Sequence, residues 1–171
     1  MKFTFFKKLI LIAVCLCLAS CTQASNDTQA SDLASKTISE CQSLAGSYSV
    51  YLAKGTEGQT GYLCDDDFYE LYYTKTAHAN ELLLLDDWCI ALSRSGTPRE
   101  LHVLKLKSKS ERPKIKEMLE RRKKRLLSPE LYGAQSDFLY TRPAQAEVFY
   151  HGYFVILCAS DDVGSVIKLL G

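Results

Sequence analysis

The sequence predicts an α+β fold: an antiparallel sheet made of two β-hairpins, in a repeated strand-strand-helix arrangement, with amphipathic helices packed on one face. Two observations lead to this prediction. Two pairs of strand-like segments are each joined by turn residues, and each pair is followed by a segment with apolar residues at helical spacing. The 139 residues from Leu33 to the C-terminus are close to the commonest size of a domain, so one globular domain is expected over 33–171.

The first predicted hairpin comprises Leu82–Leu92 and Leu101–Lys107, with turn residues at 93–98. Alternation in the second strand places His102 with two leucines on the face opposite Lys105 and Lys107. In the first strand it places one set of apolar side chains on a single face: Leu84, Trp88, Ile90 and Leu92.

The pair Asp86-Asp87 interrupts the apolar run of the first strand. Neighbouring strand residues point to opposite faces, and a buried carboxylate without a partner is costly. We therefore expect either a bulge or sheet edge at this position, or an acid that faces a binding partner.

The second predicted hairpin comprises Gln145–Tyr150 and Tyr153–Cys158. The two residues between them are His151-Gly152, with glycine in second place. This pattern favours a type I′ turn, in which both central residues adopt positive φ.

A helix is expected after each hairpin. Ser108–Glu111 has the spacing of a capping box, and Pro113 falls in the first turn, where proline is tolerated. The apolar face of this helix consists of Ile115, Met118, Leu119 and Leu126, and Leu127-Ser128-Pro129 ends it. After the second hairpin, Ser160–Asp162 caps a last helix with apolar residues at Val163, Val166, Ile167 and Leu170.

The first third of the predicted domain is less regular. Leu33–Leu44 has helical spacing, and Tyr48–Tyr62, with three glycines, reads as a loop. Asp65–Asp67 precedes Phe68–Tyr72 and suits the first turn of a short helix, because acids complement the helix dipole there. Helix starts explain these acids and Asp161-Asp162 more simply than calcium loops do.

The N-terminus has the features of an export signal. Three lysines precede Leu9–Ala19, an uncharged apolar run of eleven residues. This run is too short to cross a membrane, which takes roughly 20 helical residues. A basic start, a short apolar run and small residues at a cleavage site are typical of a secretory signal peptide, here residues 1–20.

The tetrapeptide Leu18-Ala19-Ser20-Cys21 follows the apolar run directly and resembles the lipobox of bacterial lipoproteins. The resemblance implies that the Cys21 thiol is joined through a thioether to diacylglycerol. Signal peptidase II, recognising Leu18, Ala19 and Ser20, would then cut before Cys21. A two-chain anchor holds a protein stably on a membrane without a spanning helix, so we expect an outward-facing, lipid-anchored protein at the cell membrane.

Residues 22–32, TQASNDTQASD, contain no aromatic or large aliphatic side chain. Such a segment cannot bury enough apolar area to offset the entropy of ordering it. Together with Cys21 it is predicted to be a flexible tether over 21–32, spanning on the order of 18 Å between the anchor and the domain.

The lipobox, the strand Leu101–Lys107, the charged helix with Glu120–Lys124, and Gly152–Cys158 before Ser160–Asp162 are similar to a group of small bacterial lipoproteins. Their globular part is classed as a domain of unknown function, common in Gram-positive clostridia-like bacteria. The likeness covers about Asp65 to Leu170. It implies an exported, lipid-anchored accessory domain and brings no catalytic residue with it.

Charge is unevenly distributed along the chain. Without the three lysines of the signal peptide, 18 basic and 20 acidic residues remain. Twelve of the basic residues and only four acids lie between Arg99 and Arg125. The densest cluster is Arg121, Arg122, Lys123, Lys124 and Arg125. Basic groups next to anionic lipid contribute about 1 kcal/mol each, so this helix is a candidate contact for anionic phospholipid or cell-wall polymer.

The alternative is an ordinary solvated helix face with i,i+4 ion pairs such as Glu117 to Arg121 and Glu120 to Lys124. Nucleic acid is not an expected partner, because the domain is exported and the rest of it is acidic. A protein partner of unknown identity remains open.

Four cysteines lie in the predicted domain: Cys41, Cys64, Cys89 and Cys158. Export permits disulfides, and four cysteines allow three full pairings. Cys89 and Cys158 lie inside apolar strands, where a free cysteine behaves as a small hydrophobe. Both disulfides and buried thiols are therefore open.

The sequence predicts no catalytic, metal or cofactor site. His78, His102 and His151 lie in unrelated contexts without ligand spacing, and no G-x-S-x-G motif supports a serine triad. The expected function is a non-catalytic binding or accessory domain at the cell envelope. The alternative is an exported hydrolase or a lipoprotein that binds a small solute.

Overall fold

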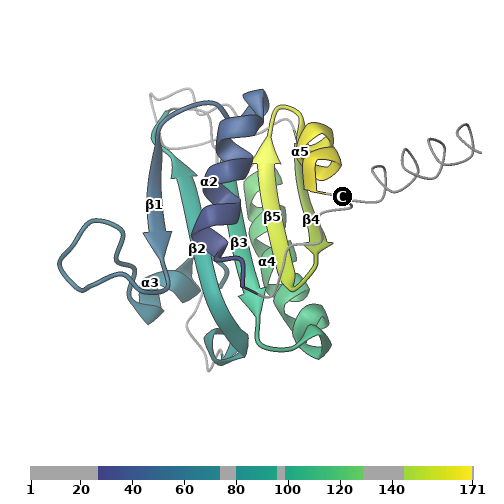
Figure 1. The fold of residues 1–171 in the computed structure, drawn as a ribbon. Coiled ribbons are helices and arrows are strands. Elements are labelled where there is room, and N and C mark those ends of the chain that lie inside the picture. The colour runs from purple at the N-terminus through teal and green to yellow at the C-terminus, as the bar shows by residue number, and fades with distance from the viewer. Residues whose placement is uncertain (1–26, 74–79, 96–98, 129–144, 171) are drawn as a thin grey trace, which may run out of the picture.

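The computed structural model describes residues 27–73, 80–95, 99–128 and 145–170, which form a five-stranded antiparallel sheet with helices on both faces (Figure 1). The strand order is β1-β2-β3-β5-β4. The strands are β1 (Tyr48–Leu52), β2 (Leu85–Ser93), β3 (Glu100–Leu106), β4 (Gln145–His151) and β5 (Phe154–Ser160). The α-helices are α2 (Ala30–Glu40), α3 (Asp65–Glu70), α4 (Arg112–Leu127) and α5 (Val163–Leu170), and the short 3₁₀ turns are η1 (Gln42–Leu44), η2 (Glu81–Leu84) and η3 (Lys109–Glu111).

Both predicted hairpins are confirmed. Strands β2 and β3 pair antiparallel, as do β4 and β5. The turn of the second hairpin lies one residue later than predicted, because His151 pairs with Phe154. Gly152, with a φ of 57°, is thereby the first residue of the two-residue turn, where type II′ turns favour glycine.

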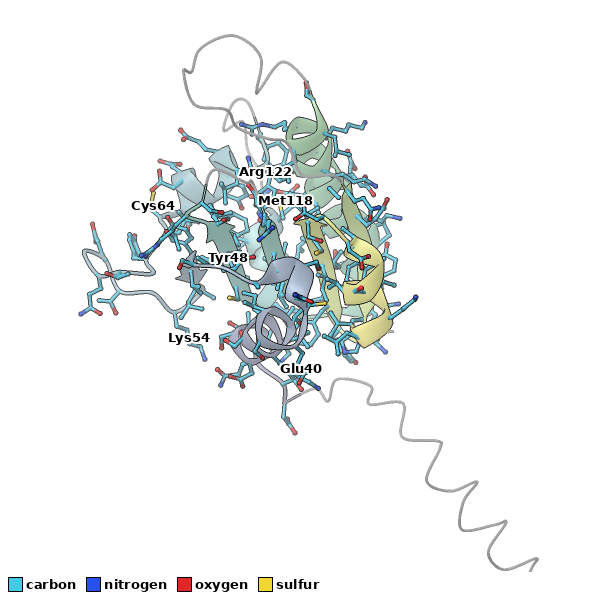
Figure 2. All side chains as sticks on the ribbon, turned by 90° about the horizontal axis from the view of Figure 1, so that it is seen from above. Glu40, Tyr48, Lys54, Cys64, Met118 and Arg122 are labelled. Atoms are coloured by element: carbon cyan, nitrogen blue, oxygen red, sulfur yellow. The ribbon has the colours of Figure 1, made fainter. Side chains whose placement is uncertain are left out.

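The prediction that the helices lie on one face is wrong. Helices α3 and α4 pack on one face of the sheet, against Trp88, Leu104 and Leu157. Helices α2 and α5 pack on the other, against Cys89, Val103 and Ile156. Figure 2 shows α2 and α5 on one side of the sheet and α4 on the other. All seven residues of β5 are buried, because this strand has a helical layer on each side.

The predicted loop over Tyr48–Tyr62 is wrong for its first five residues, which form the edge strand β1 along β2. The rest of the segment folds back on this strand: Leu52 N donates to Gly61 O at 3.0 Å. Gly61 has a φ of 93°, and a Cβ there would lie 3.1 Å from Val50 O. Glycine is therefore required where the loop covers the open edge of β1.

The predicted helical faces are mostly confirmed. All four predicted apolar residues of α4 are buried, and Ser108 caps the turn before it by accepting from Ser110 N. In α5, Ile167 is 37% exposed while the other three predicted residues are buried. The three aspartates form the first turn of α3, as predicted, but the N-cap is the Cys64 thiol, which accepts from Asp67 N.

Helix α2 begins at Ala30, so it includes the last three residues of the predicted tether. The side chain of its N-cap residue, Gln29, makes no capping bond. Instead, Asp87 Oδ2 at the start of β2 accepts from Ala30 N at 2.8 Å. The strand thus supplies the cap that the local sequence lacks, and residues 30–32 join the helix.

The bulge predicted at Asp86-Asp87 is confirmed, because the register between β2 and β3 shifts between Leu85 and Asp87. Lys105 Nζ lies 3.1 Å from Asp86 Oδ2, and Asp87 caps α2. Each acid therefore has a partner within the chain.

We expect Asp87→Ala to lower the free energy of unfolding by about 1 kcal/mol, since it removes a helix cap. The matched variant Asp86→Ala removes an ion pair whose carboxylate is 54% exposed, and it should change stability by about 0.5 kcal/mol or less. Urea unfolding of a form that starts after Cys21 measures both. Equal effects of the two substitutions would contradict the capping role.

Candidate functional site

A buried polar cluster lies where β3 faces α3 and α4. Alternate residues of β3 point to this face, and Leu104 and Leu106 fill it with apolar side chains. The same face carries Glu100 and His102, which are only 6% and 0% exposed. Because an ionised carboxylate is expensive to bury, Glu100 requires partners that compensate for lost water.

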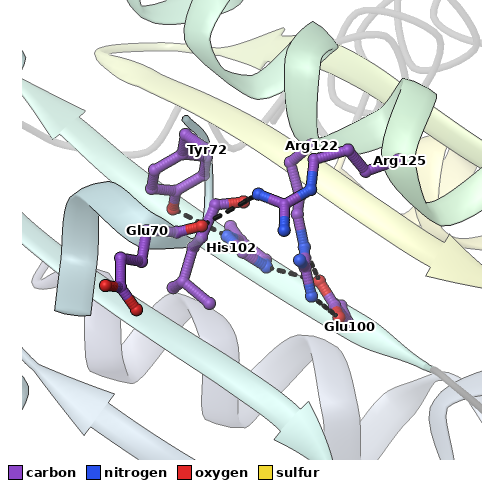
Figure 3. A network of polar contacts seen from close by, with 7 residues as sticks. Glu70, Tyr72, Glu100, His102, Arg122 and Arg125 are labelled. Atoms are coloured by element: carbon purple, nitrogen blue, oxygen red, sulfur yellow. Dashed lines mark hydrogen bonds and ion pairs between the residues drawn. The ribbon is translucent and has the colours of Figure 1, made fainter. Parts of the chain in front are cut away.

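Glu100 has two charged or polar partners (Figure 3). The guanidinium of Arg122 donates to both carboxylate oxygens, with Nε 2.9 Å from Oε2 and Nη2 close to Oε1. His102 Nε2 lies 2.9 Å from Oε2. On the other side of the imidazole, the Tyr72 hydroxyl lies 2.8 Å from Nδ1. We call these four residues, Tyr72, Glu100, His102 and Arg122, the buried network.

The hydrogen-bond partners of His102 determine which of its ring nitrogens carries the proton. The carboxylate of Glu100 accepts, so His102 donates from Nε2 and its Nδ1 accepts from the Tyr72 hydroxyl. Burial lowers the pKa of His102, although the bond to Glu100 acts in the opposite direction. Burial raises the pKa of Tyr72 well above its usual value. A neutral histidine between a protonated tyrosine and a carboxylate is therefore the favoured state.

Burial by itself would raise the pKa of Glu100. The hydrogen bonds from His102 and Arg122, together with the positive charge of the guanidinium, outweigh it and lower the pKa to about 2. The carboxylate is thus ionised at neutral pH, and the buried network holds one compensated ion pair.

A second arginine of α4 extends the same contact. Arg125 Nη1 donates to Glu70 O at 2.8 Å and to Leu71 O at 3.2 Å (Figure 3). These carbonyls lie at the C-terminal end of α3, where a cation also complements the helix dipole. Arg122 and Arg125 therefore tie α4 to β3 and to α3.

A hydroxyl, an imidazole and a carboxylate in a line have the composition of a nucleophilic triad. Here, however, the terminal hydroxyl belongs to Tyr72, which is 1% exposed and packs against Phe68, whose ring in turn contacts Trp88. A substrate cannot reach it in this arrangement. The geometry therefore serves to hold elements together rather than to activate a nucleophile.

The structure distributes the predicted basic cluster over several internal partners. Arg122 and Arg125 are half-buried and bound as described. Arg121 pairs with Glu117 at 2.8 Å, as predicted, and its guanidinium lies 5.2 Å from the ring centre of Tyr73. Lys123 pairs with Glu147 on β4 at 2.8 Å and lies 3.8 Å from Glu120. Glu120 thus lies within ion-pair distance of Lys123 instead of the predicted Lys124, whose side chain is exposed.

The four cysteines have free thiols in the structure. Cys41, Cys89 and Cys158 are buried in the layer beneath α2 and α5, and Cys64 is half-buried at the start of α3. Burial raises the pKa of Cys89 and of Cys158 to about 12. These two thiols are therefore protonated, unreactive core side chains.

The remaining candidates do not converge. His151 is half-buried at the second hairpin, His102 belongs to the buried network, and His78 lies outside the described residues, as does Cys21. Within 27–73, 80–95, 99–128 and 145–170, no three His, Cys, Asp or Glu side chains are placed to hold a metal ion. No helix in these ranges is long and apolar enough to span a membrane.

Comparisons of the chain with protein-family models, curated proteins and solved structures give no match. The resemblance to a group of small lipoproteins therefore stays a prediction from the sequence. The sequence pattern assigns no role to Glu100 or Tyr72, because Glu100 lies one residue before the predicted strand Leu101–Lys107.

We expect Arg122→Ala to destabilise the fold by about 3–5 kcal/mol, because it leaves the Glu100 carboxylate buried without its cation. The control Lys124→Ala removes an exposed cation two residues away and should cost less than about 0.5 kcal/mol. Urea unfolding gives both values. In a Glu100→Gln background the cost of Arg122→Ala should fall, and an unchanged cost would show that the two side chains are not coupled.

Stability should also fall at acid pH. The pKa of Glu100 is about 2 in the fold and 4.5 without its environment. Because the folded value is lower, the carboxylate stabilises the fold above about pH 4.5, and this contribution, roughly 3 kcal/mol, is lost as the pH falls towards about 2. Unfolding measured across this range should show a weaker pH dependence for Glu100→Gln. An identical dependence in the variant would refute the assignment.

Proposed function

We propose that this chain is an exported lipoprotein, held on the outer face of the cell membrane through a diacylglyceryl Cys21. The single observation that carries the proposal is the N-terminal sequence, in which three lysines precede an apolar segment of eleven residues that leads into Leu18–Cys21. The fold supports it, because α2 begins at Ala30, nine residues after Cys21. A domain that starts so soon after the anchor stays close to the bilayer surface.

We infer further that the domain acts by binding and not by catalysis, as an accessory module of the envelope. The buried network supports this inference, because its hydroxyl, imidazole and carboxylate groups are already hydrogen-bonded to one another and to Arg122. The alternative, an exported hydrolase or a protein that binds a small solute, needs an open site with convergent polar groups. Tyr72, His102 and Glu100 do not provide one, since all three are buried.

Anionic phospholipid, a cell-wall polymer or an envelope protein are the candidate partners. Exposed cations such as Lys109 and Lys114 support an anionic partner. Arg122 and Arg125 are poor candidates for this contact because they bind Glu100 and the end of α3.

The intact mass of protein extracted from membranes tests the anchor. We expect the mass of the chain from Cys21 plus diacylglycerol. Reduction should leave this mass unchanged, because the domain cysteines are free thiols. The variant Cys21→Ala should keep its signal peptide and lose the lipid. A wild-type mass that begins at Met1, or that lacks lipid, would overturn the proposal.

A further inference from the structure

The structure places the start of α2, the first helix after Cys21 among the described residues, at one end of the sheet. Ala30 N is bound to Asp87 at the start of β2. Because β2 and β3 are antiparallel, this end also holds the end of β3, the turn between β4 and β5, and the start of α4 (Figure 1, lower edge of the sheet). Nine residue steps separate Cys21 from Ala30, and at up to 3.6 Å each they span at most about 32 Å. We call this end of the sheet the tether end.

The tether end is rich in cations. The segment from the last residues of β3 into α4 contains one acid, Glu111, and six basic residues: Lys105, Lys107, Lys109, Arg112, Lys114 and Lys116. Of these, Lys107, Lys109 and Lys114 are exposed. Acids also lie at this end: Asp86 pairs with Lys105, Asp87 caps α2, and Glu81 in η2 accepts from the Tyr73 hydroxyl.

Two tyrosines of the β4–β5 hairpin lie among these cations. Lys109 Nζ is 4.7 Å from the ring centre of Tyr153, and Arg112 Cζ is 5.0 Å from that of Tyr150. Tyr150 is 42% exposed. Tyrosine is enriched at membrane interfaces, where its ring and its hydroxyl meet apolar and polar surroundings together.

An apolar side chain stands beside the same cations. Leu83, in the η2 turn just before β2, is 70% exposed, and Lys107 Nζ donates to its carbonyl at 2.9 Å. Next to it is a shallow hollow of about 290 Å³ lined by Asp86, Lys105, Leu106, Lys107 and Tyr153. An exposed leucine, tyrosine rings and lysines together are the side chains that suit the headgroup layer of a bilayer.

The predicted cluster at 121–125 lies at the opposite end. Arg122 binds Glu100, the first residue of β3, whereas Arg112, ten residues earlier, donates to Gly152 O at the β4–β5 turn. Helix α4 thus runs from the tether end towards the far end of the sheet. The acidic start of α3, Asp65–Asp67, lies at the same lower edge in Figure 1, beneath β1 and on the side away from the β4–β5 turn.

We propose that the tether end is a docking surface for anionic phospholipid, with Lys107, Lys109 and Lys114 at the headgroups and Leu83 entering the interface. This inference rests on the proposed lipid anchor, because the short connection to Cys21 brings this end to the bilayer. Each cation held near an anionic surface favours the docked state about fivefold. Three together favour it by about two orders of magnitude, and the domain therefore lies on the membrane in one orientation.

Lysine acetylation of the full lipidated protein in vesicles tests this orientation. We expect Lys107, Lys109 and Lys114 to react about fivefold or more slowly on vesicles that contain phosphatidylglycerol than on pure phosphatidylcholine. The exposed residue Lys124, near the C-terminal end of α4, serves as the internal control and should react equally on both. The difference should vanish in about 1 M salt, where the Debye length is about 3 Å.

A matched pair of variants separates charge at the tether end from net charge. Lys109→Gln with Lys114→Gln should abolish the protection of Lys107, while Arg94→Gln with Lys124→Gln, the same change in net charge at the far end of the sheet, should preserve it. Equal reactivity of Lys107 on both lipids in the wild type would overturn the docking surface and leave the anchor intact. Failure of the wild type to stay with any vesicle would overturn the anchor itself. Protection by isolated wall polymer but not by anionic vesicles would also refute docking on phospholipid.

Discussion

A carboxylate buried on a central strand is the constraint on which the other contacts depend. Glu100 is the first residue of β3, which lies between β2 and β5. Its side chain is buried, so little water reaches the carboxylate. Its compensation comes from His102 on the same strand and from Arg122 on α4. Tyr72, just after α3, then satisfies the second nitrogen of the imidazole. Three elements must therefore be in place before the charge can be buried without a large penalty.

The same constraint explains why so much of the basic helix is not free. Arg122 and Arg125 reach the core through long apolar stems while their guanidinium groups bind oxygens, as arginine allows. Lys109, in η3, and Lys114, in the first turn of α4, have no such role and are exposed. Helix α4 thus carries cations bound within the fold, such as Arg122 and Arg125, as well as exposed ones, such as Lys114 and Lys124. The density of basic residues along the sequence does not distinguish bound from exposed cations. The difference depends on whether another element of the fold places a carboxylate or carbonyl oxygen beside the side chain.

The parts of the fold that could be predicted are those determined by neighbouring residues. Alternation, turn residues and helical spacing identified both hairpins and the apolar faces of α4 and α5, since each depends on contacts within about twenty residues. The bulge at Asp86-Asp87 followed from the cost of burying a charge. The unbroken apolar run of β5 indicates a strand that is covered on both faces. The prediction of helices on one face did not take this run into account.

The rest depends on contacts distant in sequence. Strand β1 forms only because β2, some forty residues later, offers a free edge, and α2 starts where Asp87 can cap it. The buried network joins residues 22 and 30 positions apart, so no local pattern marks it. Likewise, the strand order determines which strand ends lie together at the tether end. The order of elements along the sequence does not give that strand order.

The protonation state of His102 tests the central claim most directly. Nitrogen-15 spectra of the imidazole should show one neutral tautomer, protonated at Nε2 and unprotonated at Nδ1, because Glu100 accepts from one nitrogen and Tyr72 donates to the other. This state should persist as the pH falls through about 6.5, the ordinary pKa of histidine, because burial lowers the pKa of His102. A proton on Nδ1, or titration at the ordinary pKa, would contradict the buried network and the account of how α3 and α4 are held on the sheet.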